Sequence, residues 1–171
     1  LVASQNFAGT CAGRRVSVVR LLNDARVALR ALLQSPRRDD FADAVLEIAA
    51  NIRHGAQLDP DAACGSIVLS AGQPYPSRHG VNTAILCSLV LDAVKAPEAH
   101  ALSCMAAALT MNIAMFELQE ALYHRTTPLG EAEQAEVRQH PDQGLALLRE
   151  LGVSDSIWLE AVAQHHEMAD G

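Results

Sequence analysis

The sequence predicts an all-α protein, and three observations support that prediction. Half of the 171 residues are hydrophobic, but only 4% are aromatic. Alanine supplies much of the apolar content and runs of β-branched residues are few, which favours closely packed helices over sheets. In several stretches the apolar residues recur at intervals of three and four, the spacing of the buried face of a helix. We therefore expect a bundle of helices.

Residues 16–33 are the first expected helix. Their apolar positions follow helical spacing, and Ser35-Pro36 ends the helix because the residue before a proline avoids helical backbone. Arginines lie mostly on the other face, which we expect to be solvated: Arg14, Arg15, Arg20, Arg26 and Arg30. Residues 1–13 show no periodicity and are expected to form a loose arm.

Two more helices are expected before the middle of the chain. Asp39 or Asp40 can cap a helix over residues 41–54, with Gly55 as its left-handed stop. A third helix is expected to begin at Pro60, because proline suits the first helical position, and to run to about residue 71.

A turn-rich stretch at residues 72–76 separates two expected parts of the chain, an N-terminal helical segment (1–74) and a second helical domain (75–171). In the second part the breaks fall at Pro97, at the loop 127–130, at Pro141 and at Gly152. Gly152 is the expected stop of one helix, and Ser154 or Asp155 is the expected cap of the last. Between the breaks, the apolar spacing predicts helices at these positions: 77–94, 98–124, 131–139, 141–151 and about 157–166.

Charge and cysteine usage limit the expected partners and compartment. A formal net charge of −7 argues against binding to DNA or to an anionic membrane. No uninterrupted apolar run reaches the ~18 residues of a membrane span, so no membrane association is expected. The cysteines lack CxxC spacing and are expected to be buried free thiols in a reducing cytoplasm: Cys11, Cys64, Cys87 and Cys104.

Histidines gather in two short motifs in the last third of the chain. His140 opens the stretch HPDQG, and His165 and His166 open the stretch HHEMADG. Imidazole and carboxylate groups in such density have the composition of a metal-ligand cluster. A His-His pair by itself is more often a polar helix end. Its spacing from the His-Pro motif is what indicates that the three histidines share a site.

These motifs resemble the HD-GYP branch of the HD phosphohydrolase superfamily. That branch typically has a proline-leucine loop, an acidic helix, His-Pro-(Asp/Glu)-x-Gly, a spacer helix and His-His-Glu-x-x-Asp-Gly. Residues 128–141 and 164–171 fit the pattern without gaps, and the resemblance covers roughly residues 75–171. It implies a helical bundle of the HD-domain type, to which residues 1–72 add further helices.

The resemblance also implies an activity and a metal site. The family hydrolyses cyclic di-GMP, a bacterial second messenger, at a two- or three-metal site that usually holds iron or manganese. Position by position, the family's metal ligands fall on His79, His140, His165 and His166. The same four histidines could instead hold a single zinc or nickel ion.

Three positions depart from the family pattern. The family's central His-Asp pair falls on Met111 and Asn112, and its lysine falls on Met115. A thioether is a poor ligand for iron or manganese, and a neutral amide cannot replace a carboxylate that offsets the repulsion between two close cations. Since the loss of one electrostatic group commonly costs roughly 10²–10³ in rate, we expect hydrolysis to be lost. The family's Gly-Tyr-Pro motif belongs after Gly171, so we expect a longer natural protein.

The favoured hypothesis is therefore a degenerate HD-GYP-like domain that acts in second-messenger signalling through binding. Its expected partner is a cyclic dinucleotide, a protein or a fused signalling module, and a homodimer is a further expectation. The alternative is an active phosphodiesterase that takes carboxylate ligands from Glu117, Glu167 or Asp170. A third interpretation, the related HDOD branch, conflicts with the His-His-Glu-x-x-Asp-Gly ending.

Overall fold

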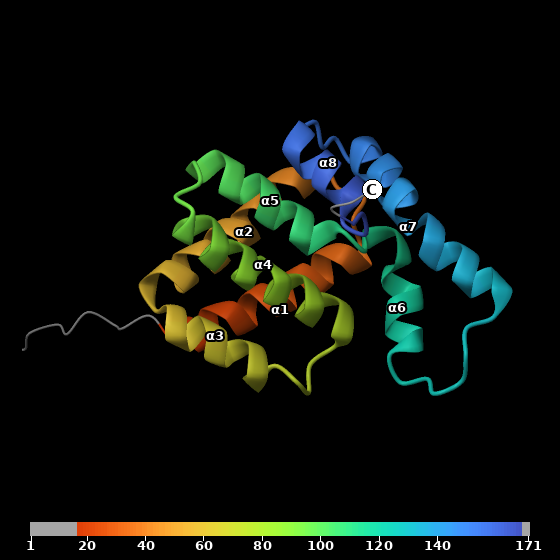
Figure 1. The fold of residues 1–171 in the computed structure, drawn as a ribbon, viewed down its shortest axis with the longest axis horizontal. Helices are drawn as coiled ribbons and strands as arrows, with labels where there is room; N and C mark the ends of the chain where they lie inside the picture. The colour runs from red at the N-terminus through yellow and green to blue at the C-terminus, as the bar shows by residue number, and fades with distance from the viewer. Residues whose placement is uncertain (1–16, 169–171) are drawn as a thin grey trace, which may run out of the picture.

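The computed structural model describes residues 17–168, and this part of the chain is helical throughout, with no strand (Figure 1). The all-α prediction is therefore confirmed. In chain order the elements are α1 (Val18–Gln34), α2 (Phe41–Leu58), α3 (Pro60–Leu69), α4 (Tyr75–Ala93), α5 (Glu98–Thr110), the 3₁₀ turn η1 (Ile113–Met115), α6 (Phe116–Leu122), α7 (Glu131–Glu150) and α8 (Ser156–Gln164).

The core lies where α1, α2, α4 and α5 pack against one another. Leu29, Phe41 and Ile85 from the first, second and fourth helices are fully buried there. Trp158 of α8 and Leu148 of α7 belong to the same cluster of buried side chains. In Figure 1, α8 lies beside the end of α5, and α7 packs against α8 and against the η1 turn that follows α5.

The chain from residue 98 is broken, and the prediction of one helix over 98–124 is wrong. Asn112 and Met115 have φ/ψ values of −105°/16° and −115°/25°, close to the bridge region rather than the helical one. Asparagine is a poor residue for a helix interior because its side chain competes for backbone hydrogen bonds. Ile113 and Phe116, which lie within and directly after the break, are both buried.

A second difference concerns Pro141. The prediction of separate helices over 131–139 and 141–151 is wrong, because α7 runs continuously through the proline. A proline in a helix interior costs about 3 kcal/mol. Three buried residues at four-residue spacing, His140, Gly144 and Leu148, anchor one face of α7 across this position. Burial of that face offsets the cost.

The expected helix ends are partly confirmed. Asp155 caps α8 by accepting a hydrogen bond from the backbone N–H of Trp158 at 3.0 Å, and Gly152 has the left-handed φ of 84° expected of a stop. Gly55 does not end its helix, because α2 continues to Leu58. A Cβ at Gly55 would lie 3.3 Å from Leu21, so this glycine permits the close approach of α1.

Two expectations about exposure are wrong. Arg26 is only 3% exposed, whereas it was expected on a solvated face. Cys64 is exposed, while Cys87 and Cys104 are partly buried, and all three are free thiols. Outside the described residues lie the expected arm over residues 1–13, Cys11, Arg14 and Arg15.

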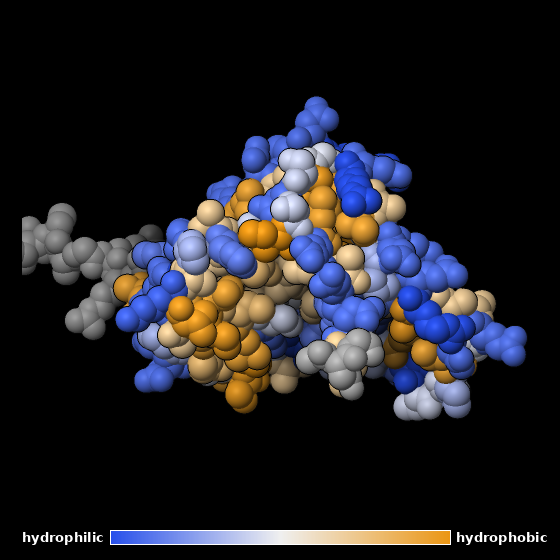
Figure 2. Space-filling view, turned by 45° about the horizontal axis from the view of Figure 1, so that its top comes forward, coloured by the Kyte–Doolittle hydropathy of each residue, from blue (hydrophilic) through white to orange (hydrophobic). Residues whose placement is uncertain are grey.

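Residues Glu98–Leu122 are long and apolar enough to cross a membrane by length and composition alone, with a mean hydropathy of 1.5. Within that stretch, 56% of the most apolar window is buried in the fold, and the chain there is divided between α5, η1 and α6. This arrangement is that of a segment of the protein core. On the face drawn in Figure 2, apolar side chains lie in separate patches among hydrophilic ones.

Candidate metal centre

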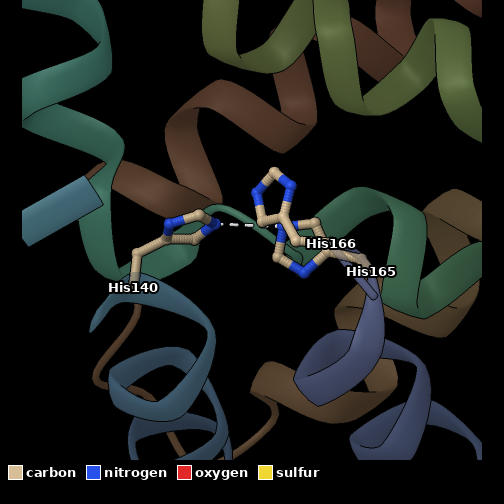
Figure 3. Close-up of side chains that lie close together, drawn as sticks. All are labelled: His140, His165 and His166. Carbon is tan, nitrogen blue, oxygen red and sulfur yellow. Dashed lines mark hydrogen bonds between the residues drawn. The ribbon is translucent and has the colours of Figure 1, made fainter. Parts of the chain in front are cut away.

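Three histidines from two helices point toward one another (Figure 3). His140 lies in α7, and His165 and His166 follow the last residue of α8. One ring nitrogen of each lies within 4.8 Å of the other two, and the Nε2 atoms of His140 and His165 are 3.0 Å apart. Between residues 17 and 168, this is the one group of three His, Cys, Asp or Glu side chains placed closely enough to hold an ion.

Pro141 explains how the His140 ring is held. In an α-helix the N–H of residue 141 would donate to the carbonyl oxygen of Val137, but proline has no N–H. The free Val137 oxygen lies 2.6 Å from Nδ1 of His140, where it can accept a hydrogen bond from that ring. The proline thus supplies the backbone acceptor that orients the preceding histidine.

The end of α8 holds the second ring in the same way. Nδ1 of His165 lies 2.8 Å from the carbonyl oxygen of Val162. Since α8 ends at Gln164, this oxygen is among the last carbonyls of the helix, which lack helical donors. In both rings a hydrogen bond from Nδ1–H leaves Nε2 unprotonated and free to act as a ligand.

Two unprotonated Nε2 atoms at 3.0 Å present lone pairs to each other, and a shared proton or a cation between them relieves that repulsion. Zinc binds imidazole at about 2.0–2.1 Å, so two ligands in a tetrahedral site lie roughly 3.4 Å apart. The present separations, from 3.0 Å up to 4.8 Å, bracket that value. The group therefore fits a metal ion with small ring movements.

The surroundings of His140 and His165 also favour the neutral imidazole, which is the form that binds a metal ion. His140 is fully buried, and burial lowers its pKa, against the raising effect of the hydrogen bond with Val137. Burial likewise lowers the pKa of His165, and the neighbouring histidines lower it further. Both rings are thus biased toward the neutral state that binds metals.

His79, the fourth expected ligand, is not part of this group of three. It lies in α4 and stacks on Tyr75, with ring centroids 5.4 Å apart and the planes 5° from parallel. Its pKa is lowered by burial and by Arg78, and its own charge lowers the pKa of His165. Its role as a ligand stays a prediction.

Met111, one of the three residues that depart from the family pattern, lies close to α7, the helix that carries His140. Met111 and Asn112 line a small cavity of about 10 Å³ together with Gly80 of α4. The carbonyl oxygen of Met111 faces Gly144, one turn after His140 in α7. Met115 and Met111 are both partly buried.

Carboxylates are not brought to the three rings within the described chain. Glu117 and Glu167 are exposed, and neither joins the group. Asp170 lies outside the described residues. The candidate site is therefore an all-nitrogen one, as far as residues 17–168 define it.

Sequence reasoning missed the two backbone oxygens that orient the rings. Pro141 was interpreted as a helix break, although its missing N–H is the signal that could have identified Val137 as a free acceptor. It also missed a stacked pair of tyrosines, Tyr75 and Tyr123, whose centroids lie 4.8 Å apart. These two residues are 48 positions apart, and no local pattern joins them.

Comparison with known proteins gives a distant relative. Over 162 residues the chain is 24% identical to the cyclic di-GMP phosphodiesterase PA4108 of Pseudomonas aeruginosa, an alignment covering 94% of this chain and 37% of that protein. The chain thus spans little more than a third of the relative's length. No protein-family profile and no solved structure matches the chain. The chain is therefore distantly related to a cyclic di-GMP phosphodiesterase.

Proposed function

We propose that this chain holds one divalent metal ion on His140, His165 and His166, and binds a cyclic dinucleotide without hydrolysing it. The observation that supports the proposal most directly is the convergence of three imidazoles with no carboxylate among the described residues. The relationship to a protein named as a cyclic di-GMP phosphodiesterase supports the choice of ligand.

The charge of the ligand set supports one ion rather than two. Two cations ~3.5–4 Å apart repel each other strongly, and hydrolases that use such pairs offset the repulsion with anionic ligands. Three neutral imidazoles supply no negative charge, and Asn112, at the position of the family's aspartate, is neutral as well. A single bound ion would have an open coordination position and would act as a Lewis acid toward a phosphate oxygen.

Within this proposal, Met111 and Asn112 stand where the family has its His-Asp pair, so the second metal ion has no ligands there. Met115 stands where the family has a lysine, so the positive charge that would face the phosphate is missing. Zinc or nickel suits the all-nitrogen set better than iron or manganese, which are commonly bound with carboxylates as well. The output of binding would pass to a partner protein, a fused module or a second copy of the chain. We propose a bacterial cytoplasm as the compartment, where cyclic dinucleotides act.

The test combines metal content with ligand binding and turnover. Protein purified without chelator under low oxygen should contain about one equivalent of metal by elemental mass spectrometry. His165→Ala and His166→Ala should each lower that content, whereas the exposed His54→Ala or His100→Ala should not. Isothermal titration with cyclic di-GMP should show binding, and chromatography should show intact ligand after prolonged incubation with Mn²⁺ or Fe²⁺.

The competing function is an active phosphodiesterase, which the name of the distant relative favours. It requires two equivalents of iron or manganese and steady hydrolysis of cyclic di-GMP that is lost in His165→Ala. A folded wild-type protein that contains two metals and cleaves the dinucleotide would overturn the proposal of binding alone. A metal-free, folded protein would overturn the metal part of it.

A further inference from the structure

Arg26 is a buried cation with an incomplete set of partners. Its Nη2 donates to neutral acceptors, at 3.3 Å to the carbonyl of Ser66 and at 2.8 Å to Oδ1 of Asn82. Its Nε atom is buried and has no partner, and no carboxylate within the described chain forms a salt bridge with it. An unpaired buried charge is costly, so Arg26 would be stabilised by an anion bound next to it at the surface.

A concavity of about 390 Å³ opens beside Arg26. The residues that line it share no negative charge, and they are the cationic Arg26 and Arg30, the polar Asn23, Gln34, Gln73 and Ser77, and the apolar Val27, Ala31 and Pro74. These groups supply hydrogen-bond donors and positive charge, with no acidic residue in the lining. Such a lining suits the oxygens of a phosphate group.

A larger concavity of about 690 Å³ adjoins the first and shares Arg30, Gln73 and Pro74 with it. Its wall contains Tyr75 and Tyr123, stacked with a centroid distance of 4.8 Å. Two neighbouring concavities therefore offer a cationic end and an aromatic end. That pairing fits a ligand with a phosphate and a flat ring.

Arg78 stiffens the aromatic wall. Its guanidinium lies 5.5 Å from the ring centroid of Tyr75 and 5.1 Å from that of Tyr123, and its Nη2 donates to the Tyr123 hydroxyl at 2.8 Å. A guanidinium over a ring adds a cation–π attraction. The wall is thus ordered before a ligand arrives, which lowers the entropy cost of binding.

We infer that the groove formed by Arg26, Arg30, Gln73, Tyr75 and Tyr123 binds a purine nucleotide, with its phosphate at the arginines and its base at the tyrosine wall. The groove lies between α1, α4 and α6, and its lining includes none of the three histidines of the metal centre. The inference therefore goes beyond the proposed function and needs no metal.

Glu120 competes with a bound phosphate for Arg30, one of the two arginines. It accepts two hydrogen bonds from Arg30, from Nε at 3.1 Å and from Nη2 at 3.3 Å. A phosphate would compete with this carboxylate for the same guanidinium edge. Removing the charge of Glu120 should therefore strengthen nucleotide binding, whereas removing that of Arg30 should weaken it.

The experiment is titration calorimetry of the full chain in EDTA with GMP, guanosine and inorganic phosphate. GMP should bind, phosphate should compete with it, and guanosine should bind about tenfold more weakly or worse because charge-assisted hydrogen bonds are lost. Arg30→Gln and Tyr123→Ala should weaken GMP binding about tenfold. Glu120→Gln should tighten it, and the exposed Arg20→Gln on the same helix should change nothing.

Each variant is first shown to be folded by its circular dichroism spectrum and thermal transition. The inference fails if GMP does not bind the wild type, or if Arg30→Gln and Glu120→Gln both bind it as the wild type does. It also fails if His165→Ala abolishes GMP binding in EDTA, since the nucleotide would then occupy the metal centre. GMP binding that persists in His165→Ala supports a separate groove, whatever the metal content proves to be.

Discussion

Pro141 follows Val137 by one helical turn and leaves the Val137 carbonyl oxygen without a helical donor, and that oxygen lies 2.6 Å from Nδ1 of His140. Pro141→Ala restores the N–H, which then competes with the imidazole for the same oxygen. We expect the free energy of unfolding to rise by up to about 3 kcal/mol. We expect metal affinity to fall about 10–100-fold, as for other losses of a ligand-orienting hydrogen bond.

Thermal unfolding of the metal-free variant and competition with a chelating dye would measure the two effects of Pro141→Ala. His140→Ala is the control, since it removes the ligand itself and should lose the metal outright. Unchanged metal affinity in Pro141→Ala would show that the backbone oxygen does not orient the ring.

Asp155 links α8 to α5 and should make stability depend on pH. Its carboxylate accepts hydrogen bonds from Ser103 Oγ at 2.6 Å and from the backbone N–H of Trp158 at 3.0 Å. Burial raises the pKa of Asp155, but these bonds outweigh it and hold the pKa below the usual 3.8. The contribution is therefore fully present above about pH 4 and is lost as the pH falls through the lower folded-state pKa.

Asp155→Ala should cost about 1–2 kcal/mol at neutral pH, since it removes a helix cap and a side-chain bond. Urea unfolding at pH 7 and at pH 3 would test this. The difference between wild type and variant should shrink at the lower pH. A constant difference at both pH values would contradict an ionised Asp155.

Trp158 and Thr110 form a buried pair that couples α8 to the end of α5. The indole Nε1 donates to Thr110 Oγ1 at 2.7 Å, and the threonine hydroxyl donates in turn to the Ala106 carbonyl at 2.8 Å. Thr110→Val should cost about 1–3 kcal/mol because it leaves the indole N–H unsatisfied.

A double-mutant cycle would isolate that pair. Thr110→Val, Trp158→Phe and the double variant are compared by urea unfolding. The losses in unfolding free energy of the two single variants, added together, should exceed the loss of the double variant by about 1 kcal/mol. The reason is that either change alone breaks the same hydrogen bond. Simple additivity would mean that the bond contributes nothing to stability.

Gly80 permits the close approach of α4 to α5. A Cβ there would lie 3.2 Å from Leu29 Cδ2 and 3.3 Å from the Leu109 carbonyl oxygen. Gly80→Ala should therefore cost about 1–3 kcal/mol through overpacking. Gly65→Ala is the matched control, because nothing lies within 4 Å of its added Cβ. It should stabilise α3 by about 0.5–1 kcal/mol, and equal effects of the two changes on the urea midpoint would contradict the packing.

The sequence predicted the fold class, most helix positions and the three histidines that the structure brings together. Helix positions were predictable because the buried stripes of α1 and α2 repeat with helical spacing. The cap at Asp155 and the stop at Gly152 were predictable because both rest on local backbone chemistry.

The errors share one physical cause, which is tertiary packing. Pro141 has a strong local tendency to end a helix, but α7 continues through it because the burial of His140 and Leu148 stabilises the helix on both sides. The stretch around Met111 has a helical pattern, but Asn112 and Met115 leave the helical backbone region where η1 packs against α7. Arg26 looked solvated because its partners Ser66 and Asn82 are 40 and 56 positions away.

The break at residues 111–115 also determines where Tyr123 lies. A straight continuation of α5 would carry Tyr123 about 20 Å beyond Thr110, at 1.5 Å for each residue. The turn instead sends α6 back toward the start of α4, so that Tyr123 reaches Tyr75 and Glu120 reaches Arg30. Residues 111–115 thus bend what would otherwise be one long helix. In a straight helix the groove would not form, although every side chain that lines it would still be present.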